Sequence, residues 1–436
     1  MIRYLGWLAL AVVANGTELP SEVQTRFAKE SPTLEPIPDA WTAISFASAA
    51  ESGDASAKLW TAYREASRQR GEDRRIAPLP IPLEELKAMP QDQRPKVTPS
   101  ELAADGKTMP YFLVAKGKKP EKGWPLVIAL HGGGGTSEKL EGPHAWPMNT
   151  REWQAQMMLF ERIYPSDAMY FIPRMADDNE GRWYYDYNQK IFDQIIRRAI
   201  LFRDVDPNRI YITGISEGGY TAFRLPANRP DRFAAACAMA AAEPLENAPP
   251  ENLRNLPFRC GIGEQDTMFD RIGLARRFFA KLDDLQKADP EGYVHQFDAQ
   301  ANHGHGIDYA PGPVWMVEHT RNPRPKTIVW TVQKLHNSID LRNNWLALDS
   351  EPSTLPVKLE ASVAGNTITV HTTPESGLKL RLFLDDRLVN LDQPVKVILN
   401  GKEAFNAKPA RNLATMVKTL ESRGDPELTY SAEISF

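Results

Sequence analysis

Residues 209–219 read RIYITGISEGG, an apolar run that leads into Gly214-Ile215-Ser216-Glu217-Gly218. The apolar part is typical of a strand that is buried on both faces, and the residues after Gly218 are compatible with a helix. A serine on a tight strand-to-helix turn adopts a strained backbone, and glycines two residues before and two residues after it avoid clashes within the turn. The stretch therefore predicts a nucleophile elbow centred on Ser216.

The strand pattern recurs on both sides of this elbow. Apolar runs that predict further strands occupy residues 124–130, 168–173, 257–262 and 293–297. Residues 192–202, between the strands predicted at 168–173 and 209–213, show helical spacing. The alanine-rich run 233–242 fits a helix or a strand equally well. Alternating strands and helices predict an α/β fold with a doubly wound, mostly parallel sheet over residues 106–322.

A glycine-rich turn, His131-Gly132-Gly133-Gly134-Gly135, follows the strand predicted at 124–130. Backbone N–H groups in a turn without side chains can point at a developing oxyanion, together with the N–H of the residue after the serine. We therefore predict an oxyanion hole formed by Glu217 and by either Gly133 or Gly134. For His131 we expect a structural role.

The serine hydroxyl needs a base that takes its proton and a carboxylate that orients the base. Asp266 follows the strand predicted at 257–262 and is the predicted acid, with Asp270 as its competitor. The loop Asn302-His303-Gly304-His305-Gly306 follows the next strand, so either His303 or His305 supplies the base. The carboxyl edge of an open α/β sheet is where such groups collect.

Two further features surround these candidates. His303, His305 and Asp308 could instead bind a metal, but the sequence shows no further ligand at a suitable spacing, so we expect no metal. Trp183 and Tyr184, in a loop after the strand at 168–173, are candidates for the substrate pocket, with packing as the alternative.

Residues 107–321 resemble the esterase branch of the α/β-hydrolases, which contains feruloyl and acetylxylan esterases, esterase D and polyhydroxybutyrate depolymerases. They are also similar to hydrolases of the prolyl-oligopeptidase type. The resemblance rests on the glycine-rich turn, on DPNRIYITGIS at 206–216, on Glu217-Gly218-Gly219 and on the Gly-His-Gly loop. It implies that His305 is the base and that no cofactor is needed.

The resemblance favours an enzyme that cleaves a carboxylic ester through Ser216, His305 and Asp266 by way of an acyl-enzyme. A peptidase with the same triad is the second hypothesis, and a non-catalytic module that binds polysaccharide or protein is the third. The chain departs from the family pattern at two positions. Pro226 is expected to kink or end the helix after the serine, and Glu217 replaces the small residue frequent at its position.

The residues before and after 107–321 follow other sequence patterns. Residues 17–105 mix helical patches, such as 57–70, with prolines and predict a helical wrapper. Residues 323–436 read as short strands separated by turns, with one helix at 411–423 that ends at Gly424. We predict a separate β-rich accessory domain, which helps to capture substrate or serves as packing or a lid.

The first residues predict export. Met1-Ile2-Arg3 is followed by an apolar stretch from Tyr4 to Ala14 and by small or polar residues, so residues 1–16 are expected to be a signal peptide. A buried helix is the alternative. No cysteine lies near the expected cleavage point, so we expect a secreted or periplasmic protein without a lipid anchor.

Composition limits the partners of the chain. Its 436 residues carry a formal net charge of −4, which disfavours nucleic acid and anionic membranes, and no apolar run is long enough for a membrane span. The expected partner is a small-molecule or polysaccharide-linked ester. Cys237 and Cys260 could form a disulfide in an exported protein or remain two buried thiols.

Overall fold

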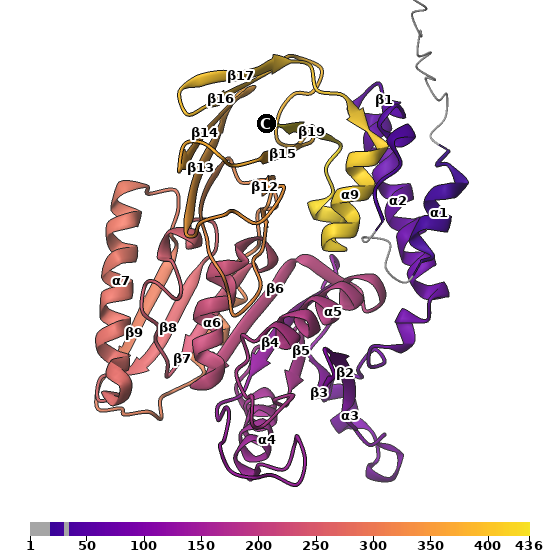
Figure 1. Cartoon of the computed structure of the whole chain (residues 1–436). Helices are drawn as coiled ribbons and strands as arrows, with labels where there is room; N and C mark the ends of the chain where they lie inside the picture. Colours follow the sequence, from indigo (N-terminus) through magenta and orange to yellow (C-terminus); the bar gives the residue numbers. More distant parts are fainter. Residues whose placement is uncertain (1–17, 30–34) are drawn as a thin grey trace, which may run out of the picture.

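The computed structural model describes residues 18–29 and 35–436, so the predicted signal peptide lies outside the described residues. An eight-stranded sheet with the order β2-β3-β5-β4-β6-β7-β8-β9 forms its centre (Figure 1). The strands β2 and β3 form an antiparallel edge, and β3 also runs antiparallel to β5, whereas all the other pairs are parallel. The strands are β2 (Ser100–Ala104), β3 (Lys107–Lys116), β4 (Trp124–Leu130), β5 (Ala168–Pro173), β6 (Val205–Ile215), β7 (Ala235–Met239), β8 (Phe258–Gly263) and β9 (His295–Gln300).

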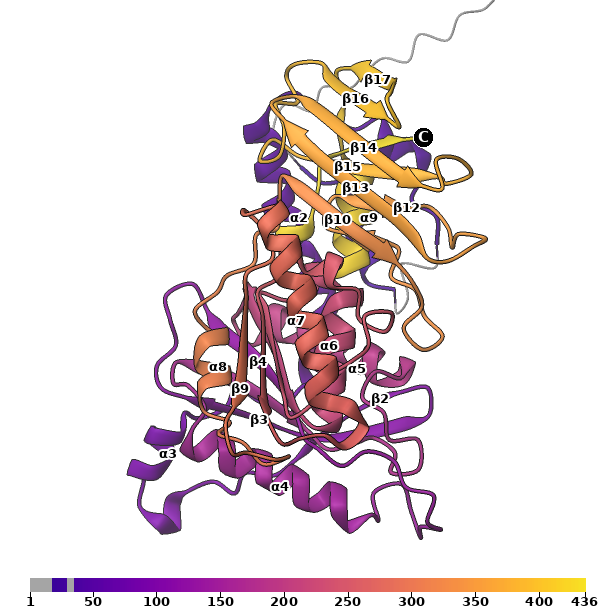
Figure 2. The same ribbon diagram turned by 90° about the vertical axis from the view of Figure 1, so that its left-hand side faces the viewer.

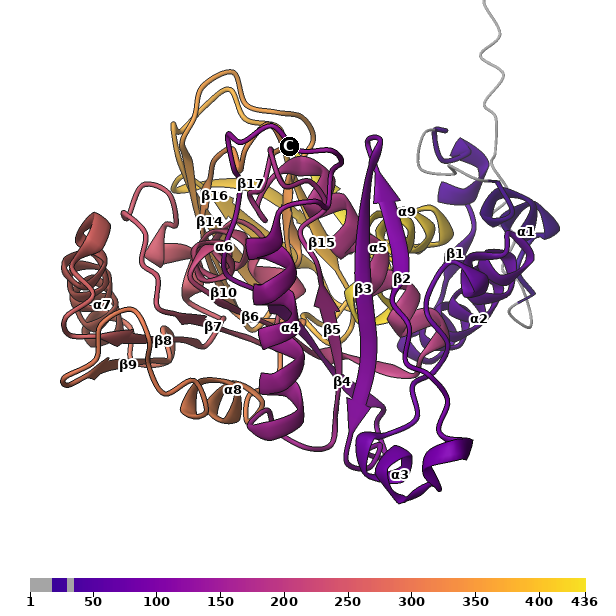
Figure 3. The same ribbon diagram turned by 90° about the horizontal axis from the view of Figure 1, so that it is seen from below.

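Helices cover both faces of this sheet, which confirms the predicted doubly wound α/β fold. The helices α5 (Asp186–Phe202), α6 (Glu217–Asn228) and α7 (Arg271–Ala288) share one hydrophobic core with the sheet. The helices α4 (Pro147–Arg162) and α8 (Pro311–Met316) pack on the opposite face. Figure 2 shows α8 and α6 on opposite sides of the strands, and Figure 3 shows α4 in front of them.

The central strands form where the sequence is apolar without interruption. Every residue of β4 and of β5 is buried, as a parallel strand covered on both faces requires. The alanine-rich run whose structure the sequence left open forms β7, which pairs with β6 and β8. Its small side chains let the helices on both faces lie close to the sheet.

The N-terminal region contributes helices and one sheet strand. Its helices are α1 (Ser21–Phe27), α2 (Ala49–Gln69) and α3 (Leu83–Ala88). Helix α2 begins before the predicted residue 57 because Ser48 Oγ accepts the Glu51 N–H, while the Glu51 carboxylate accepts the Ala47 N–H at 2.9 Å. The predicted boundary after residue 105 divides the β2–β3 hairpin, so the sheet begins inside the predicted wrapper.

The C-terminal region is rich in β-structure, as predicted. A five-stranded sheet of order β10-β13-β14-β16-β17 and a four-stranded sheet of order β11-β12-β15-β19 enclose one hydrophobic core. The bounds are β10 (Thr327–Val332), β11 (Arg342–Asn343), β12 (Leu346–Leu348), β13 (Val357–Ala364), β14 (Thr367–Thr373), β15 (Leu380–Leu384), β16 (Val395–Leu399), β17 (Lys402–Ala407) and β19 (Ala432–Ser435). Alternate residues of β13 are buried, which is typical of a strand with one face in a core.

The two ends of the described chain pack together. The helix α9 (Leu413–Arg423), which ends at Gly424 in the left-handed conformation, shares a hydrophobic cluster with α1 and α2. The strand β1 (Ser45–Phe46) pairs with β18 (Arg411–Asn412), and Figure 1 shows α2 and α9 side by side. The helices α1 and α2 therefore pack on the C-terminal region, so the predicted wrapper and the predicted accessory domain share a core.

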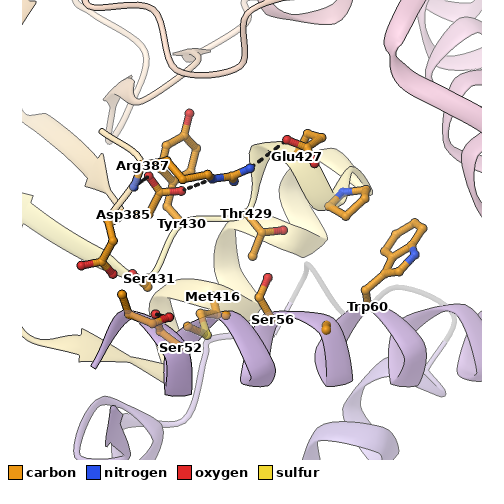
Figure 4. Close-up of a pocket in the computed structure, with 15 residues that line it drawn as sticks. Ser52, Ser56, Trp60, Asp385, Arg387, Met416, Glu427, Thr429, Tyr430 and Ser431 are labelled. Carbon is orange, nitrogen blue, oxygen red and sulfur yellow. Dashed lines mark hydrogen bonds and ion pairs between the residues drawn. The ribbon is translucent and has the colours of Figure 1, made fainter. Parts of the chain in front are cut away.

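A cavity of about 400 Å³ lies where α2 meets the C-terminal region (Figure 4). Ser52, Ser56 and Trp60 line it from α2. On the other side, the Arg387 guanidinium donates to Glu427 at 2.8 Å and to Asp385 at 3.1 Å. All the lining residues differ from the predicted site residues, so this cavity is separate from the candidate site.

Two sequence predictions concern single features of the fold. None of the helices in residues 18–29 and 35–436 is long and apolar enough to cross a membrane. Cys237 on β7 and Cys260 on β8 are buried free thiols, so the disulfide alternative is not realised. Burial raises the pKa of Cys237 to about 11 and that of Cys260 above its ordinary value, so both thiols stay protonated and unreactive.

Candidate active site

Ser216 joins β6 to α6 in a strained turn. Its φ of 53° and ψ of −111° lie in a region that L-residues rarely adopt. A Cβ on Gly214 would lie 2.2 Å from the backbone carbon of Gly218, and one on Gly218 would lie 2.4 Å from the Leu130 carbonyl oxygen. The two glycines are therefore required sterically, and the turn holds the serine at the carboxyl edge of the sheet. Pro226 lies in the last turn of α6, which continues to Asn228.

The histidine loop brings a base to this serine. His305 Nε2 lies 3.0 Å from Ser216 Oγ, and His305 Nδ1 lies 2.7 Å from Asp266 Oδ2. The His305 side chain is 47% exposed, whereas that of Asp266 is 3% exposed. The structure thus brings three predicted residues into the order hydroxyl, imidazole and buried carboxylate that a Ser-His-Asp triad requires.

The competing residues lie elsewhere. His303 Nδ1 lies 2.9 Å from the carbonyl oxygen of Ala301, so its ring is engaged within its own loop. Asp270 accepts from Arg277 Nη2 at 2.6 Å in an exposed ion pair. Among the described residues, no group of three or more His, Cys, Asp or Glu side chains is arranged to hold a metal ion.

Two backbone segments approach closely to place His305. A Cβ on Gly263, the last residue of β8, would lie 2.1 Å from the Gly304 carbonyl oxygen. The Gln265 N–H donates to the His303 carbonyl at 2.9 Å. The acid-bearing and base-bearing loops therefore pack backbone against backbone, and only glycine fits at the end of β8.

Arg271, the first residue of α7, anchors the buried acid. Its Nη1 donates to Asp266 Oδ1 at 3.0 Å, and its Nε donates to the Tyr220 hydroxyl at 2.7 Å. The first bond occupies the carboxylate oxygen that does not face His305, and the second holds the guanidinium in place, so that together they fix the orientation of Asp266. Sequence reasoning missed Arg271, because no motif marks an arginine that lies one loop beyond the acid.

The glycine-rich turn is held by Asn149 from α4. Asn149 Oδ1 accepts the Gly134 N–H at 3.0 Å, and Asn149 Nδ2 donates to the Gly134 carbonyl at 2.8 Å. The prediction that Gly134 could be an oxyanion donor is therefore wrong, because its N–H already has an acceptor. Gly133, with a φ of 97°, and the first amide of α6 at Glu217 are the predicted donors that remain.

A buried ion pair supports Asn149. Asn149 Nδ2 also donates to Asp178 Oδ1 at 2.7 Å, and Arg174 binds the same carboxylate through Nη1 at 3.0 Å and Nη2 at 2.9 Å. All three side chains are almost completely buried. Sequence reasoning missed this network, because its members come from α4 and from the segment after β5 and meet only in the folded chain.

Trp183 belongs to the core beneath the turn. Its side chain is fully buried, its Nε1 donates to the His131 carbonyl at 3.0 Å, and its ring meets the His131 ring edge-on at 4.8 Å. The prediction of Trp183 as a pocket residue is therefore wrong. Burial lowers the pKa of His131 to about 3, so this imidazole stays neutral and accepts the Met175 N–H at 3.0 Å.

A cavity of about 360 Å³ is lined by Glu217, the residue that follows Ser216, but not by Ser216 itself. Tyr184, the other predicted pocket residue, lines it beneath the Arg224 guanidinium, whose carbon lies 4.3 Å from the ring centroid. Arg224 binds Glu243 through two nitrogens at 2.6 and 2.9 Å. Further lining residues are Arg182, Glu217, Tyr220, Asn247, Phe269 and Leu274.

Glu217 carries the most perturbed carboxyl group of this cavity. Its side chain is 3% exposed and forms an ion pair with Arg182, but its Oε1 has no hydrogen-bond partner. Burial raises its pKa to about 7, against the opposing effect of Arg182 and Arg224. An ionisable carboxyl thus lies directly beside a predicted oxyanion amide.

Comparisons with known proteins match part of this chain. The family model described as "Prolyl oligopeptidase family" matches residues 174–244. A curated protein of Nocardia uniformis subsp. tsuyamanensis, described as "Putative esterase NocK", is 29% identical over 200 residues, which are 43% of this chain and 55% of that protein. The chain thus spans about half the length of this curated relative, and the predicted resemblance to hydrolases of the α/β fold is confirmed.

Two esterases are among the solved structures that match part of this chain. A thermostable esterase matches with 20% sequence identity and a TM-score of 0.35 over 51% of this chain and 63% of its own. The carboxylesterase of Bacillus cereus matches with 15% identity and a TM-score of 0.33 over 48% of this chain and 92% of its own.

Proposed function

We propose that the protein is a serine hydrolase that cleaves carboxylic esters through an acyl-enzyme. The observation that carries the proposal is the continuous hydrogen-bonded series of Ser216 Oγ, the His305 imidazole and the buried Asp266 carboxylate, with spacings of 3.0 and 2.7 Å. The strained backbone at Ser216 supports it, because such strain is typical of a functional turn.

Each group has a defined role in the proposed reaction, and His305 acts both as base and as acid. Ser216 Oγ attacks the ester carbonyl carbon while its proton passes to His305 Nε2, and Asp266 holds the imidazole by its Nδ1–H. The N–H groups of Glu217 and Gly133 stabilise the oxyanion of the tetrahedral intermediate. His305 then protonates the leaving alcohol, and water hydrolyses the acyl-enzyme with His305 again as base.

Active-site labelling tests this proposal. A fluorophosphonate probe should modify Ser216, and peptide mapping would identify the modified residue. His305→Ala should lower the turnover of 4-nitrophenyl acetate by about a thousandfold or more. His303→Ala is the matched control from the same loop and should retain activity. Labelling of another residue, or equal activity of both variants, would contradict the triad.

A peptidase is the second candidate, and the match of residues 174–244 to the prolyl oligopeptidase family favours it. The triad can cleave an amide by the same steps, because only the leaving group differs. Short peptide 4-nitroanilides and 4-nitrophenyl esters should be compared at equal enzyme concentration. A higher kcat/KM for the anilides would assign peptidase activity, whereas hydrolysis that persists unchanged in Ser216→Ala would favour the non-catalytic binding module.

We also propose that the protein is exported, so that its substrate is a small-molecule or polysaccharide-linked ester outside the cytoplasm. The basic start and apolar stretch of residues 1–16 support this proposal. Amino-terminal sequencing of the protein from its native host should find the mature chain beginning near Gly16. A mature chain that retains Met1 would contradict the signal peptide.

A further inference from the structure

The cavity that Glu217 lines contains an arginine, Arg182, with N–H groups that have no acceptor in the described residues. Arg182 is 48% exposed and reaches Glu217 through Nη1. In the described part of the chain, its Nε and Nη2 have no hydrogen-bond acceptor. By contrast, Arg224 in the same cavity binds Glu243 through two nitrogens. In the described residues, Arg182 thus has two nitrogens without an acceptor and Arg224 has one, so Arg182 has more donors left for a ligand.

The present partner of Arg182 is poorly satisfied. Glu217 is buried, and its Oε1 lacks any hydrogen-bond partner in the described residues, so its ionised form pays a desolvation cost that one ion pair does not offset. Protonation removes this cost, and burial indeed raises the pKa of Glu217 to about 7. Glu217 is thus a carboxyl that can give up Arg182 to another anion.

We infer that this cavity binds a carboxylate carried by the ester substrate, with Arg182 as its counter-ion in place of Glu217. The inference rests on the proposed hydrolase function, and it names the substrate class. A guanidinium fork matches the two oxygens of a carboxylate, which favours this anion. Glu217 lines this cavity, pairs with Arg182 and follows Ser216 in the chain, and on this ground we place the carboxylate on the molecule that the serine attacks.

The rest of the cavity suits such a ligand. Tyr184 and Tyr220 line it with aromatic rings, and the Arg224 guanidinium covers one face of the Tyr184 ring. The exposed ring of Phe269, which is 73% accessible, adds an apolar surface at the rim. A volume of about 360 Å³ is within the usual range of small-molecule pockets and leaves room for a short chain or ring between the ester and its carboxylate.

Two pairs of matched esters test the inference. The 4-nitrophenyl monoester of glutaric acid and 4-nitrophenyl valerate share a five-carbon acyl chain and differ in a terminal carboxylate. 4-Acetoxybenzoate and phenyl acetate differ in a carboxylate on the alcohol side. Each rate is divided by that of uncatalysed hydrolysis. We expect one anionic ester to exceed its neutral partner in kcat/KM by about ten- to a hundredfold, the value of a charge-assisted hydrogen bond.

Variants of two arginines with similar exposure complete the test. Arg182→Gln should abolish the preference for the anionic ester, mainly through KM. Arg387→Gln, which changes a 49% exposed arginine paired with Glu427 in the C-terminal region, should retain the preference. Equal kcat/KM for both members of both pairs, or a preference that survives in Arg182→Gln, would overturn the inference.

Direct binding separates this inference from the proposed function. Calorimetric titration of Ser216→Ala with the glutarate monoester and with 4-acetoxybenzoate measures the anion site without hydrolysis. Binding that is lost in Ser216→Ala/Arg182→Gln supports the site even if the wild-type protein hydrolyses no ester. If neutral esters are hydrolysed through Ser216 while neither anionic ester binds better than its neutral partner, the hydrolase stands and the carboxylate site falls.

Discussion

Asn149 holds the two peptide groups on either side of Gly134. Its amide accepts from the Gly134 N–H and donates to the Gly134 carbonyl, and a Cβ on Gly133 would lie 2.3 Å from its Oδ1. Asn149 thus holds the backbone directly after Gly133, and the lack of a side chain on Gly133 allows this close approach. Asn149 is a positioning residue in the proposed reaction, since it acts on the oxyanion through a backbone amide.

Replacing Asn149 by alanine should mainly lower kcat. Loss of an ordered oxyanion donor lowers kcat by about a hundred- to a thousandfold in other hydrolases, and a displaced donor should approach the lower end. Steady-state kinetics with 4-nitrophenyl acetate measure kcat and KM separately. Asn179→Ala is the control, because Asn179 bonds the same loop at Thr136 and Glu138 and should change neither constant strongly. An unchanged kcat in Asn149→Ala would refute the positioning role.

Glu217 should make the proposed activity depend on pH near 7. Arg182, Arg224 and Glu243 act on its charge, and Tyr184 and Tyr220 line the same cavity. Below its raised pKa of about 7 the carboxyl is neutral, and above it a negative charge lies beside the oxyanion amide. We expect the ratio of kcat for Glu217→Gln to kcat for the wild type to increase as pH rises from 6 to 8.

The same group fixes the sign of a stability change. Because the folded pKa of Glu217 exceeds the ordinary value of 4.5, folding takes up a proton between about pH 4.5 and 7, and the free energy of unfolding decreases as pH rises through this window. Glu217→Gln removes this contribution. Urea unfolding at several pH values should show the variant gaining stability relative to the wild type with rising pH. A constant difference would mean that Glu217 is ionised throughout.

Secondary structure elements were predictable where local pattern and final environment agree. The uninterrupted apolar runs of β4 and β5 are buried on both faces, and their bounds match the sequence pattern. The alanine-rich β7 was ambiguous because alanine fits both structures, and only its position between β6 and β8 makes it a strand. Helix α2 extends beyond the predicted range because Ser48 caps it earlier.

The candidate site was predictable to the extent that its residues follow strand ends. Ser216, Asp266 and His305 each lie just after a parallel strand, and the common direction of those strands brings them together. Asn149, Arg271 and the buried position of Trp183 were not predictable, because each depends on how a helix or loop packs on the sheet. Local patterns carry no information on such contacts.

The loops that carry Asp266 and His305 approach each other closely at Gly263, the last residue of β8. A side chain on Gly263 would collide with the Gly304 carbonyl and push the His305 loop away from Ser216. Gly263→Ala should therefore lower the proposed activity by about tenfold or more, because a displacement near 1 Å misaligns the base. The control Gly304→Ala, in the same loop, has nothing within 4 Å of its added Cβ and should remain active. Fluorophosphonate labelling rates of both variants measure the effect.

The C-terminal region contacts both the central sheet and the edge of the candidate site. The loop after β10 reaches the start of α5, where the His336 ring stacks on Tyr185 at 4.1 Å. From the same loop, Gln333 Nε2 donates to the Asn247 carbonyl at 3.3 Å. The Asn247 side chain in turn donates to Glu243, and both residues line the cavity that Glu217 lines. The β-rich region thus supports the walls of that cavity.

Buried charges join this region to the sheet. Arg423, at the end of α9, donates to Asp231 at 3.0 Å and to Asp340 at 3.0 Å, and all three side chains are at most 8% exposed. The Asn344 N–H also donates to Asp231 at 3.1 Å. Burial alone would raise the pKa of Asp231, but Arg423, Arg232 and Arg342 hold it below its ordinary value. The ion pairs therefore keep Asp231 charged inside the protein.

Removing the Arg423 cation should destabilise the whole molecule and make it sensitive to acid. Arg423→Ala leaves two buried carboxylates without this counter-ion, so the free energy of unfolding should fall by about 3–5 kcal/mol in urea titrations. Arg387→Ala removes a half-exposed arginine that pairs with Glu427 and Asp385, and it should cost at most about 1 kcal/mol because Arg324 still binds Asp385. Because the pKa of Asp231 is lowered by folding, its contribution exists above pH 3.8 and is lost as pH falls through the lowered value. In Arg423→Ala that pKa rises, so acid unfolding should begin at a higher pH than in the wild type. Equal acid midpoints would show that Arg232 and Arg342 suffice to hold the charge.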